Sequence, residues 1–308
     1  MQKLFTRCLE LDRPWDLDVY VGEQQGYRAL RKALGMSSDE VVAEVLGASL
    51  RGRGGAGFST GMKWGFLKKA RPDLPHYLVI NADEGEPGTF KDRLIMEYDP
   101  HRLVEGIICS CYALDCHTSY IFVRGELELA IRRLNTAIAQ AREAGWLGES
   151  VGGSGFALEI YVHPGAGAYI CGEETALLEC LEGKPGQPRM KPPFPANVGL
   201  FGCPTIINNV ETIACVPSIL NDGAEGFASF GSPKNGGIKL YGLSGHVRRP
   251  GMYEARHGIH LRELIFGEDY GQGVREDRAL KAVIPGGSSC PILMPDEIDV
   301  AMDFDALR

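Results

Sequence analysis

Residues 76–88 have the sequence HYLVINADEGEPG, in which an apolar run gives way abruptly to a polar one. The apolar part, 76–80, contains large and β-branched residues and follows a proline, so it predicts a strand. Asp83, Glu84 and Glu86 then place three carboxylates within four residues. Such groups accept hydrogen bonds from sugar hydroxyls and can ligate a metal, whereas a solvated turn needs no ligand. The stretch therefore predicts a strand that ends at a candidate binding loop.

The segments after this loop alternate between helical and strand patterns. The predicted elements are a helix over 99–115, a strand over 119–125, a helix over 126–144, a strand over 157–163 and a helix over 173–181. Alternation of this kind predicts an α/β fold with a parallel, doubly wound sheet, in which ligands bind at the carboxyl ends of the strands. The polar loops 81–88 and 164–172 both lie at such ends.

The texture of the sequence changes again beyond this region. Six prolines between residues 183 and 204 argue against regular structure there, and a helix is expected to resume over 208–220. From about residue 236 the pattern is one of short strands and turns. The predicted parts are an N-terminal helical segment with a glycine-rich loop (1–61), an α/β domain (62–235) and a small β-rich domain (236–308).

The N-terminal part ends in the glycine-dense loop RGRGGAGFSTG (51–61). Gly52, Gly54 and Gly57 fit the GxGxxG dinucleotide pattern, but a predicted helix rather than a strand precedes them, which disfavours a standard Rossmann site. Consecutive N–H groups without Cβ atoms can still wrap an anion, whose charge Arg53 and Lys63 would balance. The alternative is a tight turn without a ligand. Helices are expected over 26–34, over 37–50 with a capping box between Ser37 and Glu40, and over 62–70.

A second glycine loop, GAGAYICGEET (165–175), opens the helix predicted over 173–181. Its small residues allow a flat ring to approach the backbone, and Tyr169 could stack or hydrogen-bond. Glu173 and Glu174 fall in the first helical turn, where the helix dipole alone would explain them. Asn208 and Asn209 open the next predicted helix and, taken alone, read as a cap pair. For Phe58, Trp64, Phe66 and Phe194, each taken singly, a core position is the default expectation.

The bulk composition narrows the function classes. Glycine accounts for 40 of 308 residues, about 13% against a usual share of about 7%, without any repeat. The net charge of −8 argues against a nucleic-acid partner. No apolar run approaches the roughly 20 residues of a membrane helix, and the N-terminus is charged where a signal peptide would be apolar. The protein is therefore expected to be soluble and intracellular.

The nine cysteines contain no CxxC pair and, without a signal peptide, argue against a disulfide framework. Cys109, Cys111 and Cys116 lie in the apolar run GIICSCYALDC. A buried helix is the expected setting of that run, so these three are expected to be core thiols.

Four blocks in order carry a family resemblance: GRGGAGFSTGMKW (52–64), INADEGEPGTFKDR (80–93), GAGAYICGEETALLECLEGKPGQPRMKPPFP (165–195) and PTIINNVETI (204–213). Together they resemble the NADH-binding flavoprotein subunit of respiratory complex I. Relatives of that subunit include the diaphorase subunits of NAD-reducing hydrogenases and of NAD-dependent formate dehydrogenases. KLYGLSGHVRRPGMYE (239–254) is similar to the β-grasp domain that follows the flavin domain in this family. The match runs from about Tyr20 to the end of the chain.

The resemblance implies a flavin site with NADH stacked on it, and hydride transfer between the two without a catalytic side chain. The implied FMN-binding residues are Gly52, Arg53, Gly54, Lys63, Asn81, Asp83, Glu84, Tyr169, Gly172, Glu173, Glu174, Asn208, Asn209 and Thr212. The implied NADH-binding residues are Phe58, Phe66, Glu86, Glu174, Lys191 and Phe194. The resemblance also implies onward electron transfer to iron–sulfur partner subunits, in the cytoplasmic peripheral arm of a membrane-associated complex.

Two departures from the family pattern stand out. Ser59 takes the place of a usual proline in the first glycine loop, which is expected to loosen the loop without emptying it. The family also continues into a helical domain whose cysteines ligate a [4Fe–4S] cluster. Those ligands are missing here and the β-grasp domain looks incomplete, so the chain is expected to be a fragment or a truncated protein with no metal site of its own. Two alternatives remain open: a diaphorase subunit of a soluble hydrogenase or formate dehydrogenase, and a non-catalytic scaffold subunit.

Overall fold

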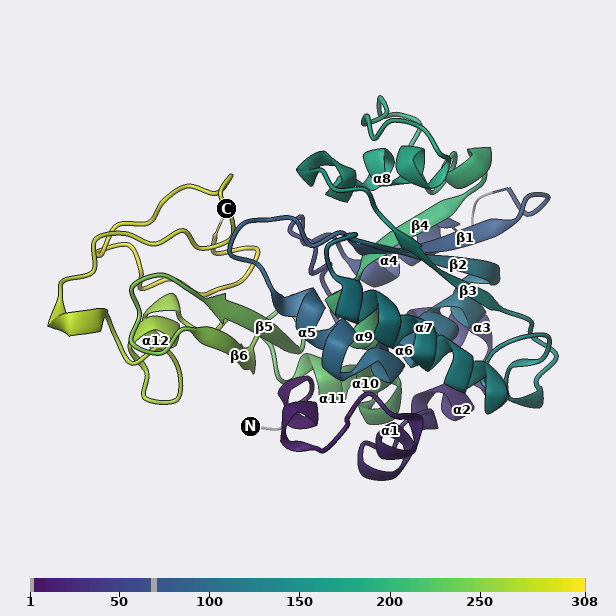
Figure 1. Ribbon diagram of the computed structural model, residues 1–308, viewed down its shortest axis with the longest axis horizontal. Helices are drawn as coiled ribbons and strands as arrows, with labels where there is room; N and C mark the ends of the chain where they lie inside the picture. Colours follow the sequence, from purple (N-terminus) through teal and green to yellow (C-terminus); the bar gives the residue numbers. More distant parts are fainter. Residues whose placement is uncertain (1–2, 68–70, 308) are drawn as a thin grey trace.

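A computed structural model describes residues 3–67 and 71–307. A parallel sheet with helices on both faces occupies most of the chain, and a smaller unit built on a hairpin follows toward the C-terminus (Figure 1). The predicted α/β class is confirmed. Within the described residues, no helix is both long enough and apolar enough to cross a bilayer.

The sheet fixes where a ligand can bind. Its four strands are β1 (His76–Ala82), β2 (Cys116–Val123), β3 (Glu159–Pro164) and β4 (Thr205–Asn209). They are parallel and lie in the order β3-β2-β1-β4. The chain runs from β1 to β2 and β3 on one side and then crosses to β4 on the other. The strand order thus reverses between β1 and β4, which is where open α/β sheets bind their ligands.

Alternate residues of the strands face two different cores, as the period of a strand requires. Leu78 and Ile80 of β1 join the large cluster around α6 (Pro100–Leu114), whereas Val79 joins a smaller cluster with α8 (Glu174–Leu181). Figure 1 shows α8 on one face of the sheet and α6 with α7 (Glu128–Glu143) on the other. Burial on both faces explains why the strand HYLVI is apolar throughout.

Helix α6 is the centre of the larger core. All but one of its residues are buried, and Cys109 and Cys111 lie on it with Cys116 just beyond. The prediction that these three are core thiols is confirmed. The α6 carboxylate of Glu105 accepts hydrogen bonds from the Tyr20 hydroxyl and, at 2.9 and 3.0 Å, from the backbone N–H groups of Tyr27 and Leu30. This contact joins the N-terminal helices to the core.

The remaining helices surround this core or connect its parts. The α-helices are α1 (Leu17–Glu23), α2 (Arg28–Leu34), α3 (Ser38–Gly47), α4 (Thr60–Leu67), α5 (Lys91–Tyr98), α9 (Val210–Ala214), α10 (Val216–Asp222) and α11 (Ala224–Ala228). The 3₁₀ helices are η1 (Thr6–Glu10), η2 (Val151–Gly153), η3 (Tyr169–Gly172), η4 (Leu200–Gly202) and η5 (Arg275–Asp277). The predicted capping box of α3 is confirmed, since Ser37 and Glu40 each accept a hydrogen bond from the other's backbone N–H.

Several predicted boundaries differ from the structure. The helix expected over 208–220 is instead the end of β4 followed by α9 and α10. Only five residues form β4, and Asn209 both ends the strand and caps α9, so the cap signal concealed the strand. Helix α5 was not predicted, because its residues follow directly on a loop rich in turn formers. Helix α3 ends at Gly47 and not at residue 50, β2 starts at Cys116 and not at 119, and residues 68–70 of the helix expected over 62–70 lie outside the described residues.

The C-terminal unit begins with an antiparallel hairpin, β5 (Ile238–Leu243) and β6 (Gly251–Arg256), followed by α12 (Leu261–Phe266). Leu240 of the hairpin belongs to the large core, whereas Tyr241 belongs to a separate cluster that includes Leu264 and Ile298. The hairpin therefore packs against both cores. Beyond α12, isolated bridges such as His260 with Ala301 hold the chain to this unit.

Candidate functional site

The first glycine loop lies against the carboxyl ends of β1 and β4. A bridge between Arg51 and Ser59 and a 2.8 Å hydrogen bond from Gly52 N to Phe58 O close the loop on itself. A Cβ on Gly54 would stand 3.3 Å from the Cβ of Asn209, so the bare backbone packs on the end of β4. The loop is thus placed at the point where the strand order reverses, and helix α3 precedes it, as predicted.

Arg53 divides its backbone and side chain between two regions. Its N–H donates to Thr212 Oγ1 at 2.8 Å, next to the loop. Its buried guanidinium instead reaches the C-terminal unit, where it lies 2.6 Å from His257 Nδ1 and donates to the Gly236 carbonyl at 2.9 Å. The expectation that this guanidinium balances an anion in the loop therefore differs from what the structure shows, because its donors are used in an internal contact.

Lys63, Glu174 and Lys191 form a charged cluster at the start of α8. Lys63 Nζ lies 3.1 Å from Glu174 Oε2 and donates to the Ile207 carbonyl at 2.8 Å. Lys191 Nζ lies 2.7 Å from Glu174 Oε1 and 3.0 Å from Glu173 Oε1. Burial opposes the ionisation of Glu174, but the two ammonium groups outweigh it and lower its pKa. The cluster holds an ionised carboxylate between two cations beside the sheet edge.

Glu173 also caps α8. Its Oε2 accepts hydrogen bonds from the N–H groups of Thr175 and Ala176 at 2.8 and 2.9 Å. This is the local alternative that the sequence offered for Glu173, and the structure confirms that capping role.

Asn81 and Asp83 lie at the end of β1, facing the second glycine loop. The Asn81 side-chain amide donates to the Gly172 carbonyl at 2.8 Å, and its Oδ1 accepts from Asp83 N at 3.2 Å. Asp83 Oδ2 is buried and has no hydrogen-bond partner among the residues that the structure describes. Burial raises the pKa of Asp83 to about 6. A Cβ on Gly172 would stand 3.5 Å from that oxygen, so bare backbone borders it.

Glu84 has a different role from Asp83, although the two are adjacent. Its carboxylate accepts hydrogen bonds from the N–H groups of Asp92 and Arg93 at 2.8 and 3.0 Å, in the first turn of α5. Burial and the nearby Asp92 raise the pKa of Glu84 to about 7. The side chain therefore satisfies otherwise unpaired N–H groups at a helix start.

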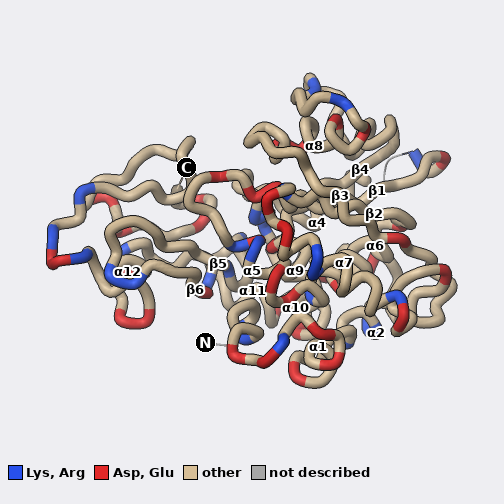
Figure 2. The backbone as a smooth tube through the Cα atoms, viewed as in Figure 1, with Lys and Arg blue, Asp and Glu red and all other residues tan. Residues whose placement is uncertain are grey.

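A buried ionic cluster that the sequence analysis missed lies behind the asparagine pair. Lys91 Nζ contacts Asp92 Oδ1, Glu211 Oε2 and Asn209 Oδ1 at 2.7, 3.0 and 3.1 Å. Basic and acidic positions lie next to each other near α5 and α9 in Figure 2. Asn208 Oδ1 accepts from Trp64 Nε1 at 3.0 Å. Both asparagines are thus positioned by long-range contacts, and only the block KDR at 91–93 could have signalled the cluster.

The aromatic residues of the site separate into two groups. Trp64 is fully buried, as expected. Phe58, Phe66 and Phe194 are each about half exposed, with Phe58 and Phe66 ring centroids 6.1 Å apart. The default expectation of a core position is wrong for these three phenylalanines. Exposed rings beside a glycine loop are suited to stacking on a planar ligand.

Glu86 connects the acidic loop to two other segments. Tyr169, which is largely exposed, donates from its hydroxyl to Glu86 Oε2 at 2.5 Å. The N–H and hydroxyl of Ser288, in the C-terminal unit, both donate to Glu86 Oε1, at 2.5 and 2.8 Å. Ser288 was not predicted, because no local pattern links residues 202 positions apart.

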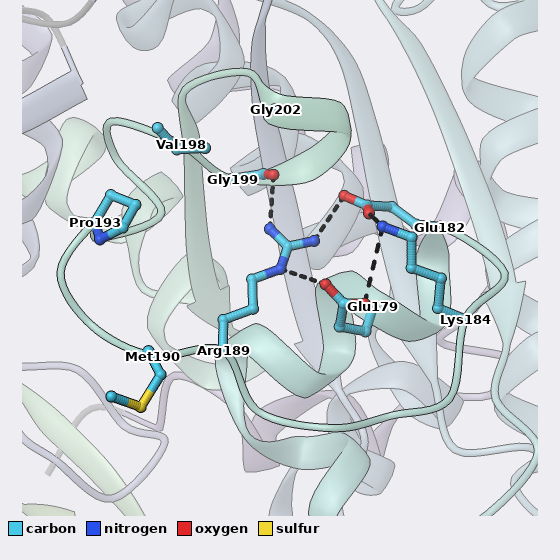
Figure 3. A pocket seen from close by; sticks show the side chains of 9 residues that line it. All are labelled: Glu179, Glu182, Lys184, Arg189, Met190, Pro193, Val198, Gly199 and Gly202. Carbon is cyan, nitrogen blue, oxygen red and sulfur yellow. Dashed lines mark hydrogen bonds and ion pairs between the residues drawn. The ribbon is translucent and has the colours of Figure 1, made fainter.

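A cavity of about 320 Å³ lies away from these residues, between the C-terminal end of α8 and the proline-rich segment (Figure 3). Its Arg189 donates to Glu179 Oε1 at 2.5 Å, to Glu182 Oε1 at 2.7 Å and to the Gly199 carbonyl at 2.8 Å. The guanidinium is therefore fully engaged by the protein. In the described part of the chain, no cluster of three or more His, Cys, Asp or Glu side chains is arranged to hold a metal ion.

Comparisons with known proteins agree with this geometry. Residues 45–218 match the family model described as the Nuo51 FMN-binding domain. The second F-type component of the NADH-quinone oxidoreductase of Rhizobium meliloti (strain 1021) is 58% identical over 283 residues, which cover 92% of this chain and 66% of that protein. The F component of the corresponding enzyme of Mycobacterium tuberculosis (strain ATCC 25618 / H37Rv) is 55% identical over 298 residues, which cover 95% and 66%.

A solved structure is also similar. A chain of an NAD+-reducing [NiFe]-hydrogenase in the H2-reduced state aligns with a TM-score of 0.82 and 34% identity, covering 100% of this chain and 49% of that one. The present chain therefore spans about two thirds of the length of the curated relatives named above and about half of the hydrogenase chain.

Proposed function

The chain belongs to the family of the Nuo51 FMN-binding domain, and from that membership we propose that it binds FMN and NADH and oxidises NADH as the flavoprotein component of an NADH:quinone oxidoreductase. One observation carries the proposal. It is the buried Asp83 Oδ2, which has no hydrogen-bond partner among the described residues although it lies at the ligand edge of the sheet.

The residues around Asp83 fit FMN. A buried carboxylate oxygen without a donor costs roughly 1–3 kcal/mol, and a sugar-alcohol hydroxyl of FMN supplies such a donor. The bare backbone of Gly172 leaves room for it. The N–H groups of the first glycine loop suit the phosphate, with Lys63 as the cation next to the loop. The proposed FMN contacts come from Gly52, Arg53 through its backbone, Gly54, Lys63, Asn81, Asp83, Glu84, Tyr169, Gly172, Glu173, Glu174, Asn208, Asn209 and Thr212.

The exposed aromatic rings support a second, stacked ligand. Phe58, Phe66 and Phe194 present half of their surface to solvent beside the loop, and stacking on a base would remove that surface from water. Glu86 can accept hydrogen bonds from ribose hydroxyls, and the pair Glu174–Lys191 can contact the amide and phosphates. The proposed NADH contacts are Phe58, Phe66, Glu86, Glu174, Lys191 and Phe194.

The chemistry that FMN supplies when bound is acceptance of a hydride from the reduced nicotinamide. The side chains of this protein bind and orient the two ligands, and the proposal gives none of them the role of acid or base. Glu174, kept ionised by Lys63 and Lys191, provides a fixed negative charge beside the reacting rings.

The proposed setting is the peripheral, cytoplasmic arm of a respiratory complex, where iron–sulfur partner subunits receive the electrons and a [4Fe–4S] cluster belongs to the longer relatives. Identities of 58% and 55% with the F components of NADH-quinone oxidoreductases, against 34% with the hydrogenase chain, favour this setting. The hydrogenase likeness supports a diaphorase subunit as the second candidate. The proposed domains are 1–61, 62–235 and 236–308.

The test is reconstitution of the purified chain with FMN, followed by titration with NADH and ferricyanide as acceptor. We expect stoichiometric flavin uptake, bleaching by NADH and ferricyanide reduction. Lys63→Gln should weaken FMN binding about tenfold or more, since a charged hydrogen bond of about 1.5–3 kcal/mol is lost. Lys184→Gln, which removes an exposed lysine paired with Glu182, is the matched control. A folded chain that takes up no FMN contradicts the proposal and favours the scaffold alternative.

A further inference from the structure

Two cysteines meet beside the candidate site without belonging to its proposed contacts. Cys171 lies in η3 and Cys180 in the last turn of α8, and their sulfur atoms are 3.5 Å apart. All nine cysteines of the chain are free thiols in the structure. We propose that Cys171 and Cys180 are a redox-modification site, in which a small-molecule disulfide converts the two thiols into a reversible intramolecular disulfide.

The surroundings of the two sulfur atoms support this proposal. A side chain at Gly186 would place its Cβ 2.9 Å from Cys171 Sγ and 2.8 Å from Cys180 Sγ, so the pair lies against bare backbone. Both cysteines are partly exposed, whereas Cys8, Cys109, Cys111, Cys116 and Cys215 are buried. An oxidant can therefore reach the pair. Bond formation needs the sulfurs to approach to about 2.05 Å, a shift that side-chain rotation and the short η3 segment can share.

The chemistry is thiol–disulfide exchange in two steps. The Cys171 thiolate attacks a small disulfide RSSR, forms a mixed disulfide and releases RS⁻, which takes up a proton as RSH. Cys180, as its thiolate, then displaces the second RS⁻ and forms the Cys171–Cys180 bond. The two protein thiols lose two electrons and two protons, and RSSR becomes two RSH. Burial and the neighbouring Cys171 raise the pKa of the Cys180 thiol to about 11, which favours Cys171 as the first nucleophile.

The bond would join two segments that carry the site. Cys171 lies between Tyr169, which donates to Glu86, and Gly172, whose carbonyl accepts from Asn81. Cys180 lies six residues into the helix that Glu173 caps. Oxidation would therefore fasten the second glycine loop to α8. Because the inference rests on the sulfur positions alone, it stands or falls separately from the proposed binding of FMN.

The experiment treats the full, folded chain with bis(2-hydroxyethyl) disulfide at neutral pH and measures the intact mass. Digestion with a glutamate-specific protease under non-reducing conditions follows, because Glu173, Glu174 and Glu179 separate the two cysteines. We expect a loss of two hydrogen masses and a Cys171–Cys180 cross-linked peptide pair, both reversed by dithiothreitol. Cys203 and Cys290, also partly exposed, serve as internal references that can acquire only adducts.

A Cys180→Ser variant is the second arm. Without the resolving thiol, Cys171 should retain one mercaptoethanol adduct in place of the internal bond. The proposal is overturned if the unsubstituted chain carries separate adducts on Cys171 and Cys180, or if both stay unmodified while Cys203 or Cys290 reacts. Near-ultraviolet circular dichroism of the same samples shows that the chain is folded in each arm.

Discussion

At the scale of single residues, Asp83 is the most informative side chain of the site. Burial raises its pKa to about 6, above the ordinary value of about 3.9. Because the folded state then holds the proton more tightly than the unfolded state, the contribution of Asp83 to stability is fully present below about pH 4 and is lost as the pH rises through about 6. We expect this loss in the cofactor-free protein.

Asp83→Asn removes the titrating group and so tests that expectation. The difference between the urea midpoints of the unsubstituted chain and Asp83→Asn should change across pH 4–6 and be flat from pH 7 to pH 8. Identical pH profiles for both proteins would show that Asp83 is not held in the environment described.

A second prediction at this scale concerns Gly172. A methyl group there would stand 3.3 Å from the Asp83 carbonyl oxygen and 3.5 Å from Oδ2, in the space assigned to FMN. Gly172 is not among the glycines with positive φ, so alanine fits its backbone. We expect Gly172→Ala to fold normally and to bind FMN about tenfold more weakly, equivalent to about 1.4 kcal/mol.

The matched control for Gly172→Ala is Gly22→Ala in α1, where a Cβ meets nothing within 4 Å. That change should stabilise the helix by about 0.5–1 kcal/mol and leave FMN binding unaltered. Fluorescence quenching of FMN on titration gives both affinities. Equal affinities in the two variants would argue against FMN beside Gly172.

At the scale of elements, Glu105 shows how a single acid connects α1 and α2 to α6. Its carboxylate accepts from the Tyr20 hydroxyl and two backbone N–H groups in a fully buried position. Glu105→Ala leaves these donors without an acceptor, and we expect a loss of about 3–5 kcal/mol of unfolding free energy. Glu143→Ala, at an exposed position in α7, should change it by less than about 0.5 kcal/mol. Denaturant unfolding of both variants decides between them.

The elements that could be predicted from sequence are those whose signal is local. HYLVI is apolar because β1 is covered on both faces, and the pair Ser37–Glu40 is a capping box within four residues. Strand β4 escaped prediction because it is short and its last residue doubles as a helix cap. Likewise, glycine loops and polar strand ends announce a site, whereas the partners of Lys91 and Glu86 come from distant segments that only the folded topology brings together.

At the scale of the whole molecule, the chain closes on itself through carboxylates that reach between its parts. Glu254 of β6 accepts hydrogen bonds from the N–H groups of Leu4, Phe5 and Thr6 at 2.5–3.1 Å. Arg53 extends from the glycine loop to His257 in the same unit. The C-terminal unit is therefore attached to both the N-terminal segment and the site. This arrangement gives residues far from the sheet a route to influence ligand binding.

Ser288 is the residue through which that influence can be measured. It donates twice to Glu86 Oε1 while Tyr169 donates to Oε2, and each carboxylate oxygen has about two acceptor positions, so Oε2 retains one for a ribose hydroxyl. Ser288 thus orients Glu86 and does not compete with the nucleotide. We expect Ser288→Ala to raise the KM for NADH about three- to tenfold in the FMN-loaded protein with kcat unchanged, since the lost hydrogen bond acts on ground state and transition state alike. Ser289→Ala, one residue further along the same exposed loop, is the control and should leave both constants as they are. A lower KM in Ser288→Ala would mean that the serine occupies the position of the nucleotide, and equal constants in both variants would mean that the C-terminal unit takes no part in binding it.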